Sequence, residues 1–402
     1  MHLRRYSSMF AALGMVSLAP WLVLAAEQPL GVPTDGPPFR GTLVAADGAW
    51  KLHFSQEKGP REIAAADLEL WGNFVEPART IQIVLPSGGM IATASLRIEK
   101  ENLQGSSSVF ESLNIPIELA AGIIFRPPLD RAKQDQLRMR IASSGGQTDR
   151  VLLDNGDELT GTIAGLDEKG LTLQTDVGNV LLEINKLVAA FFNPTLLKPA
   201  APSGFRVLVG FQDGSRVTAL KLSADKSTAT LQLPDGLQLK TATDAIVALQ
   251  PLGGRVEYLS DLKPASYRHI PFLSLSWPFA ADRSVLQGQL RASGKPYAKG
   301  LGMHSPARIT YDLKGAYRRF QAELAIDDEA GQGGSVVFRV FVDDGSGAWQ
   351  ERATSETIRG GEPPVPLSVD LAGAKRISLL VDYADRGDEL DHADWLNARL
   401  VR

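Results

Sequence analysis

Two short stretches hold the residues whose types could bind or transform a ligand. The first is Lys299–Ser305, in which two glycines flank Leu301 directly before His304. Glycine lets the backbone approach a neighbour or a ligand where a Cβ would clash. The second is Asp382–Trp395, whose fourteen residues contain six carboxylates, one His and one Trp. This density is unusual in a chain with five His and six Trp, and it predicts that the two stretches form a ligand site.

These residue types suit the recognition of sugars. A Trp ring offers a flat apolar surface to the C–H face of a sugar, and carboxylates and imidazoles exchange hydrogen bonds with hydroxyls. We therefore expect a shallow site lined by His304, Asp391, His392, Asp394 and Trp395. Each of three rings also has a plainer role. His304 could bind a backbone carbonyl, His392 could be a solvated turn residue, and Trp395 could cover the second sheet of a sandwich with Arg399 stacked on it.

The alternation of side chains along the last strand predicts which face is core. In a regular strand one face would carry Asp394, Leu396, Ala398 and Leu400, and the other Trp395, Asn397 and Arg399. We expect the leucine face to be core. Trp395 would then lie on the polar side.

The acidic residues of the second stretch could also bind calcium. Oxygen ligands in a glycine-containing loop are what this ion prefers, and Asp385 and Asp388 are the candidate ligands. Their spacing does not follow the EF-hand pattern. Asp327–Asp328 forms a second acidic loop with the same ambiguity. Solvated, ionised loops are the simpler interpretation of both stretches.

We expect no catalysis by this chain. Glycoside hydrolysis needs two carboxyl groups at a set separation, one of them with a pKa raised by burial. A zinc site built on His304, His392 and Asp394 would have suitable ligand types but no supporting spacing. There is no Gly-x-Ser-x-Gly motif, no Cys nucleophile and no phosphate-binding loop in the sequence.

Five ordered blocks of the C-terminal third give a family resemblance. They are Tyr297–Ser305, Tyr317–Phe320 with Ile326–Asp328, Ser335–Val340, Val381–Asp388 and Asp391–Trp395. On these residues, Phe279–Arg402 resembles the NPCBM type of carbohydrate-binding module, which is also found beside catalytic domains of glycoside hydrolase families 27, 95 and 98. The resemblance implies a galactose-binding-like β-sandwich, a jelly roll, that holds sugars without cleaving them. It does not extend to residues 27–250.

Composition and the N-terminal residues indicate the compartment. A net charge of −4, without a basic stripe, argues against nucleic-acid binding. Residues 1–26 have two Arg, an apolar run and two final Ala, which is the layout of a secretory signal peptide. A retained membrane anchor is the alternative. The chain has no Cys, so a secreted product must rely on core burial in place of disulfides.

The rest of the chain reads as short strands joined by turns. An internal repeat with a period of 58 residues predicts two small β-barrels of the Sm-like sort, at 147–193 and 205–251. Residues 36–146 are expected to be a β-rich region with one helix near 129–141, in which Gly41–Leu43 with Asp47 is interpreted as a decayed third copy. Residues 252–402 are expected to be the sandwich, preceded by an extended segment that lies on it.

The sequence thus predicts a mainly β protein that is secreted, periplasmic or attached to the cell envelope. Its expected function is to bind a hexose of a glycan through the C-terminal module, without transmembrane segment after signal cleavage. The alternative function is structural. In that case the repeats and the sandwich would bind other envelope proteins, because the repeats take up as much chain as the sandwich.

Overall fold

The computed structural model describes residues 28–198, 204–271, 274–313 and 317–402. Strands dominate this part of the chain, which confirms the predicted mainly β class. The predicted signal peptide, residues 1–26, lies outside the described residues. Among the described helices, none is long and apolar enough to cross a membrane.

The region 30–252 repeats one arrangement of strands four times, and we number the repeats as units 1 to 4. Unit 1 contains β1 (Leu30–Pro33), β2 (Phe39–Arg40), β3 (Thr42–Ala46), β4 (Lys51–Ser55), β5 (Arg61–Ala64), the 3-10 turn η1 (Ala65–Asp67) and β6 (Leu68–Gly72). Unit 2 contains β7 (Ile81–Val84), β8 (Met90–Thr93), β9 (Ser95–Glu99), β10 (Asn102–Ser106), β11 (Leu113–Pro116), η2 (Ile117–Leu119) and β12 (Gly122–Ile124).

Units 3 and 4 follow the same plan. Unit 3 contains β13 (Asp149–Leu153), β14 (Glu158–Leu166), β15 (Gly170–Thr175), β16 (Gly178–Glu183), η3 (Ile184–Lys186) and β17 (Leu187–Phe191). Unit 4 contains β18 (Arg206–Phe211), β19 (Arg216–Ala219), β20 (Lys221–Ala224), β21 (Thr228–Gln232), β22 (Gln238–Ala242), η4 (Thr243–Ala245) and β23 (Ile246–Leu252). In each unit a 3-10 turn precedes the closing strand.

Each unit is barrel-like because its closing strand returns to its first strand. The pairs are β1–β6, β7–β12, β13–β17 and β18–β23. The closing strands also pair between units, β6 with β23 and β12 with β17. One buried apolar cluster contains side chains from all of these units. Units 1 to 4 therefore share a core and form a single body.

Apart from β1, units 1 and 2 lie in the β-rich region expected over residues 36–146, and they have the same strand plan as units 3 and 4. The expected helix is present as α1 (Arg131–Ala142). It begins after Asp130, whose carboxylate accepts a hydrogen bond from the Lys133 amide at 2.9 Å.

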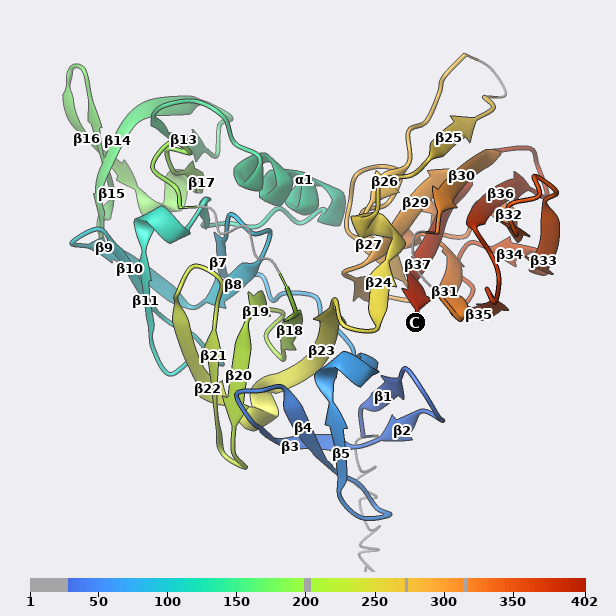
Figure 1. Ribbon diagram of the computed structural model, residues 1–402. Coiled ribbons are helices and arrows are strands. Elements are labelled where there is room, and N and C mark those ends of the chain that lie inside the picture. The colour runs from blue at the N-terminus through green and yellow to red at the C-terminus, as the bar shows by residue number, and fades with distance from the viewer. Residues whose placement is uncertain (1–27, 199–203, 272–273, 314–316) are drawn as a thin grey trace, which may run out of the picture.

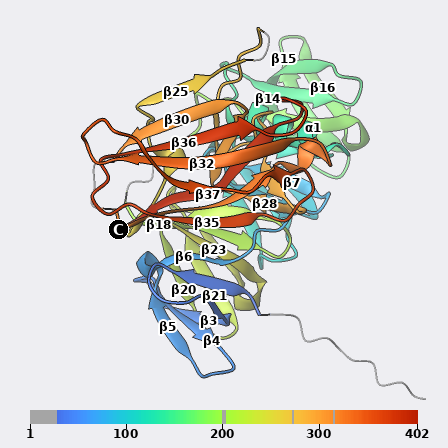
Figure 2. The ribbon, with the colours of Figure 1, turned by 90° about the vertical axis from the view of Figure 1, so that its right-hand side faces the viewer.

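The C-terminal part is a two-sheet sandwich, as predicted. One sheet runs in the order β26 (Ala280–Ala281), β29 (Gly300–His304), β37 (His392–Val401), β31 (Arg319–Ile326) and β35 (Val365–Asp370), with β24 (Val256–Tyr258) on β37. The other runs in the order β25 (Ser266–His269), β30 (Ala307–Asp312), β36 (Arg376–Tyr383), β32 (Ser335–Asp343) and β33 (Gln350–Thr354), with β34 (Ile358–Arg359) on β32 (Figure 2).

Short elements complete the sandwich, and its two sheets enclose a second large apolar cluster. These elements are the hairpin of β27 (Leu290–Ala292) and β28 (Lys295–Tyr297), and the turns η5 (Leu259–Asp261) and η6 (Asp328–Ala330). Figure 1 shows the sandwich beside the four units, with α1 directed toward it.

Buried polar contacts join the sandwich to the units. The fully buried Glu69 carboxylate of β6 accepts a hydrogen bond from Arg399 Nη2 of β37 at 2.6 Å. Beside this pair, Gln250 Nε2 donates to Asn397 Oδ1 at 3.0 Å. Removing one partner of such a pair leaves an unpaired buried charge, which is costly. The two parts are therefore held in a defined relative position.

Candidate functional site

Trp395 lies in the core of the sandwich, so the expectation that it sits on the polar side is wrong. Its ring packs edge-on against Phe338, with centroids 4.9 Å apart. The cause is a β-bulge: the register of β31 and β37 shifts between Gln321 and Glu323, and Asn397 has a φ of 50°. A bulge inserts one residue and reverses the alternation. The core side chains of β37 are accordingly Ala393, Trp395, Ala398 and Leu400.

His304 and His392 lie side by side at one end of the first sheet. They are paired residues of β29 and β37, and their ring centroids are 5.8 Å apart. Trp277 stacks on His304 with centroids 4.9 Å apart and planes 4° from parallel. The ring of His269 meets His304 edge-on at 5.7 Å. We call Trp277, His269, His304 and His392 the ring cluster.

Backbone contacts fix the position of the ring cluster. His304 Nδ1 lies 2.9 Å from the Ser305 carbonyl oxygen, so the plainer role expected for this His is also present. The Trp277 amide donates to His269 Nδ1 at 3.2 Å. The hydroxyl of Tyr267 donates to the Trp277 carbonyl at 2.8 Å. The segment that carries Trp277 is thus fastened to the sandwich, as expected for the extended segment before it.

The ring cluster combines aromatic rings with a buried polar atom that has no partner among the described residues. His304 and His392 are 5% and 7% exposed, and Trp277 is half-buried. Burial lowers the pKa of His392 to about 4, so this ring is neutral at pH 7. Its Nδ1 has no hydrogen-bond partner among the described residues. His392 is therefore not the solvated turn residue of the plainer interpretation, and its Nδ1 is an unsatisfied polar atom that lies beneath the protein surface.

Asp391 supports the loop after His304 from below the surface. It is fully buried, and its Oδ1 accepts a hydrogen bond from the Ser335 amide at 2.7 Å. Its Oδ2 accepts a hydrogen bond from the Ser305 hydroxyl. Burial raises the pKa of Asp391 to about 6. This residue positions the loop and does not line an open surface.

Asp394 points away from the sandwich core and lies beside Asp327. Both carboxyl groups are fully buried. Asp327 accepts hydrogen bonds from the Arg291 and Glu329 amides at 3.0 and 2.9 Å. Burial raises the pKa of Asp327, and burial together with the neighbouring Asp327 raises the pKa of Asp394 well above its ordinary value. The expectation that these acids sit in wet, ionised loops is wrong, because Asp391, Asp394 and Asp327 are enclosed.

The two candidate calcium ligands lie apart from this buried pair. Asp385 is exposed and forms an ion pair with Arg359 at 2.7 Å. Asp388 is half-buried. Over the described ranges, no group of three or more His, Cys, Asp or Glu is placed to hold a metal ion. Calcium binding stays a prediction.

Trp277 and His269 are the two members of the ring cluster that were not predicted from the sequence as site residues. The segment around Trp277–Pro278 has too many apolar residues for a free linker, and this signal correctly indicated that it lies on the sandwich. The sequence gives no indication that the ring reaches His304, because the contact depends on how Tyr267 and His269 hold the segment.

Two curated proteins are similar to part of this chain. A "Putative endo-alpha-N-acetylgalactosaminidase" of Renibacterium salmoninarum is 29% identical over 187 residues, which are 45% of this chain and 12% of that protein. An "Alpha-1,3-galactosidase B" of Akkermansia muciniphila is 32% identical over 120 residues, 29% of this chain and 14% of that protein. The chain thus spans only a small part of the length of these relatives.

Two solved structures with similarity to this chain contain CBM51 modules. The CBM51 of Clostridium perfringens GH95 in complex with methyl-galactose is 24% identical, with a TM-score of 0.32, over 36% of this chain and 99% of that chain. The CBM51-2 and INT domains of Clostridium perfringens ZmpB, in complex with GlcNAc, are 25% identical, with a TM-score of 0.33, over 58% of this chain and 44% of that chain. The NPCBM/NEW2 domain matches residues 255–401, which confirms the resemblance found in the sequence. The C-terminal sandwich of this protein is therefore an NPCBM/NEW2 domain.

Proposed function

We propose that this chain is a non-catalytic carbohydrate-binding protein that holds a hexose of a glycan at the ring cluster. The observation that carries the proposal is the stacking of Trp277 on His304 beside the unpartnered Nδ1 of His392. An aromatic ring with a polar atom at its edge matches a sugar, which presents C–H faces and hydroxyls. The NPCBM/NEW2 domain supports this proposal.

The sugar we expect is galactose or N-acetylgalactosamine. Both relatives named above carry names of enzymes that act on these sugars. Affinity for a single sugar should be weak, because hydroxyl groups that bind the protein give up good hydrogen bonds to water. Binding to a glycan displayed at high density would compensate by multivalency.

The proposed absence of catalysis rests on the placement of the carboxyl groups. Asp327 and Asp394 form a close pair with raised pKa values, but both are fully buried beneath the β27–β28 hairpin. In a glycoside hydrolase the glycosidic bond must lie between the two carboxyl groups, so a pair that is enclosed in the protein does not fit this role. Localisation outside the cytoplasm is supported by the signal-like pattern of residues 1–26.

A glycan array probed with residues 27–402, with and without calcium, tests the proposal. We expect selective binding that His304→Ala and Trp277→Ala weaken and that His53→Ala, in β4 of unit 1, leaves unchanged. Binding that requires calcium would assign the ion a role near Asp385 and Asp388. An array that stays blank with a well-folded protein, or binding that both cluster variants retain, would refute the proposed site.

A second candidate function, assembly with another protein, is favoured by one observation on unit 3. Three apolar side chains near β16 are exposed: Val177 at 94%, Leu181 at 56% and Ile184 at 41%. Among the described strands, β16 pairs only with β15. Figure 1 shows this hairpin at the end of the molecule far from the sandwich. An exposed apolar edge strand is a template for an extended segment of a partner protein.

Site-specific cross-linking tests this second function. A photoreactive benzoylphenylalanine at Leu181 should give one covalent adduct of defined mass in intact cells, and the same probe at the exposed Arg352 should give none. Equal labelling at both positions, or no adduct at Leu181, would contradict assembly through β16.

A further inference from the structure

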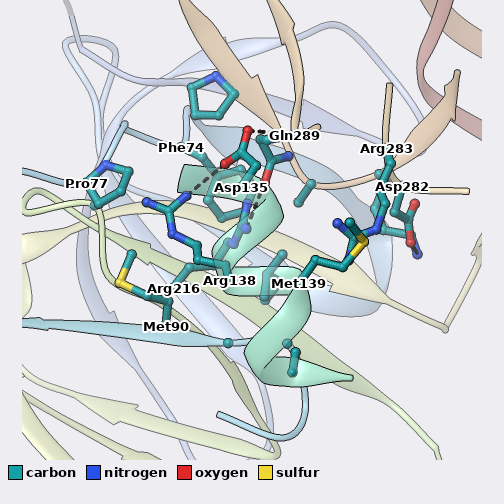
Figure 3. A pocket seen from close by; sticks show the side chains of 18 of the residues that line it. Phe74, Pro77, Met90, Asp135, Arg138, Met139, Arg216, Asp282, Arg283 and Gln289 are labelled. Atoms are coloured by element: carbon teal, nitrogen blue, oxygen red, sulfur yellow. Dashed lines mark hydrogen bonds and ion pairs between the residues drawn. The ribbon is translucent and has the colours of Figure 1, made fainter. Parts of the chain in front are cut away.

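A cavity of about 410 Å³ lies between the units and the sandwich, away from the ring cluster (Figure 3). Its walls come from the segment between units 1 and 2, from α1, from β18 and β19, and from the loop and hairpin between β26 and β29. This volume is within the range of small-molecule sites. Sites for small molecules also occur preferentially where two domains meet.

Basic side chains outnumber acidic ones around this cavity. The basic residues are Arg138, Arg216, Arg283, Arg291 and Lys299, and the acidic residues are Glu76, Asp135 and Asp282. The acidic groups are already engaged. Arg291 pairs with Glu76 and with Asp135, and Lys299 pairs with Asp282 at 2.6 Å. The cavity therefore has an excess of positive charge.

Arg216 and Arg283 are the two cations at the cavity that form no ion pair among the described residues. Arg216 Nη2 donates to Gln289 Oε1 at 2.9 Å, and its guanidinium lies 5.9 Å from the centre of the Phe74 ring. Over the described ranges, no carboxylate lies within ion-pair distance of Arg216. Burial lowers the pKa of Arg216, which is the mark of a positive charge without full compensation. Figure 3 shows Arg216 beside Asp135 and Gln289 at the cavity wall.

Arg138 on α1 adds a second incompletely satisfied guanidinium. Its Nε and Nη1 donate to Gln82 and Asp135, both at 2.9 Å. Its Nη2 is buried and has no hydrogen-bond partner among the described residues. Burial lowers the pKa of Arg138 to about 10. An unsatisfied buried donor is rare in a folded protein and calls for an explanation.

We propose that this cavity binds a small ligand bearing an oxyanion, a carboxylate or a sulfate or phosphate group, through Arg216. The guanidinium offers several donors in a planar fork that matches such groups. Arg138 adds positive charge at the cavity wall, and the apolar side chains of Phe74, Met90 and Met139 line the space for the rest of the ligand. An acidic monosaccharide combines these features.

The proposed site is separate from the ring cluster. Lys299, at the cavity, immediately precedes β29, and His304 ends this strand. Five strand residues span roughly 15 Å. The two sites are therefore independent, and an anion in the cavity would touch both the units and the sandwich. Its binding should stabilise their association, because a ligand that binds only the folded state raises the free energy of unfolding.

Isothermal titration of residues 27–402 tests the proposal with glucuronate, inorganic sulfate, inorganic phosphate and neutral glucose. We expect binding of at least one anion, with no heat from glucose at the same concentration. Arg216→Met should weaken this binding by at least about tenfold, because it removes a charged hydrogen-bond donor. Arg216→Lys keeps the charge and should bind with intermediate affinity. Arg352→Met, on the exposed surface of β33, is the matched control.

The anion that binds identifies the source of the oxyanion. Glucuronate alone indicates a carboxylate ligand, whereas sulfate or phosphate alone indicates a tetrahedral group. Gln289→Glu provides a check that does not remove an arginine, since it places a carboxylate against Arg216 and should abolish anion binding. The proposal is overturned if no anion binds at millimolar concentration, or if folded Arg216→Met and Gln289→Glu variants bind as tightly as the unmodified protein.

Discussion

Trp277 stacks on His304 with ring centroids 4.9 Å apart and planes 4° from parallel. The two residues come from different parts of the sandwich, since Trp277 lies in the segment before β26 and His304 ends β29. The contact thus depends on the backbone and hydroxyl hydrogen bonds that hold the Trp277 segment on the sandwich. It gives the NPCBM/NEW2 domain an aromatic surface at one end of its first sheet.

Trp277→Ala should weaken sugar binding without unfolding the protein. Loss of the aromatic surface should raise the dissociation constant about tenfold, which corresponds to about 1.4 kcal/mol. The thermal midpoint should change little, because Trp277 is only half-buried. Titration calorimetry with the best ligand from the array and a thermal melt give the two values. Unchanged affinity in a folded variant would remove Trp277 from the site.

Trp395→Ala should have the opposite profile. Its ring is fully buried against Phe338 and Phe320, so truncation should lower the free energy of unfolding by about 3–5 kcal/mol. Urea unfolding measures this loss. If Trp395→Ala unfolds at the same urea concentration as the unmodified protein while sugar binding disappears, Trp395 contacts the ligand and the core assignment fails.

Asp394→Asn should stabilise the protein at neutral pH. The pKa of Asp394 is raised in the folded state, so its ionisation opposes folding. The protonated Asp394 carboxyl group contributes fully to stability below its pKa in the unfolded state, which is near 3.9. This contribution is lost as the pH rises, by about 1.4 kcal/mol per pH unit at most. Urea unfolding at several pH values should show that the free energy of unfolding of the variant rises relative to that of the unmodified protein from pH 4 upward. A constant difference would show that Asp394 ionises freely in the fold.

His392→Gln should alter the acid side of the stability profile. The pKa of His392 falls from 6.5 to about 4 in the folded state. The neutral His392 ring therefore contributes fully to the free energy of unfolding above pH 6.5. This contribution is lost as the pH falls toward 4, by up to about 3 kcal/mol. The raised pKa of Asp391, about 6, gives an opposite slope over part of this range. The difference in the free energy of unfolding between the unmodified protein and the His392→Gln variant isolates the contribution of His392. This difference should shrink as the pH falls. A difference that grows instead would mean that His392 is charged in the fold.

Glu69→Ala should loosen the sandwich from the units. The substitution leaves Arg399 without its carboxylate at a buried position, which should cost about 3–5 kcal/mol. Differential scanning calorimetry should then resolve two transitions where the unmodified protein shows one. Glu111→Ala breaks an exposed pair with Lys240 and should cost less than about 1 kcal/mol. A single unshifted transition for Glu69→Ala would show that this pair does not join the two parts.

The sequence predicted those features that depend on local patterns. The helix near 129–141 and the repeated strands of units 3 and 4 follow from periodicity and turn residues. Unit 2 was missed because its turns differ in length and residue type, although the strand pairing of β7 with β12 is the same. Pairing between distant strands does not require matching turns.

The candidate site shows why alternation alone misplaces residues. A single bulge at Asn397 places Trp395 in the core, and no sequence feature of the segment Ala393–Val401 predicts this bulge. His304 and His392 were chosen by residue type, and the pairing of β29 with β37 brings them together. Burial of Asp394 depends on the β27–β28 hairpin packing over it, which is a tertiary feature.

The most direct test of the central claim is an NMR titration of residues 27–402 with isotope-labelled histidine. This segment contains His53, His269, His304 and His392. Adding the best galactose-type ligand should shift the imidazole signals of His304 and His392 in a saturable way, with His53 of unit 1 as the internal control that does not move. Saturable binding that leaves the signals of His304 and His392 unchanged would contradict the proposed sugar site.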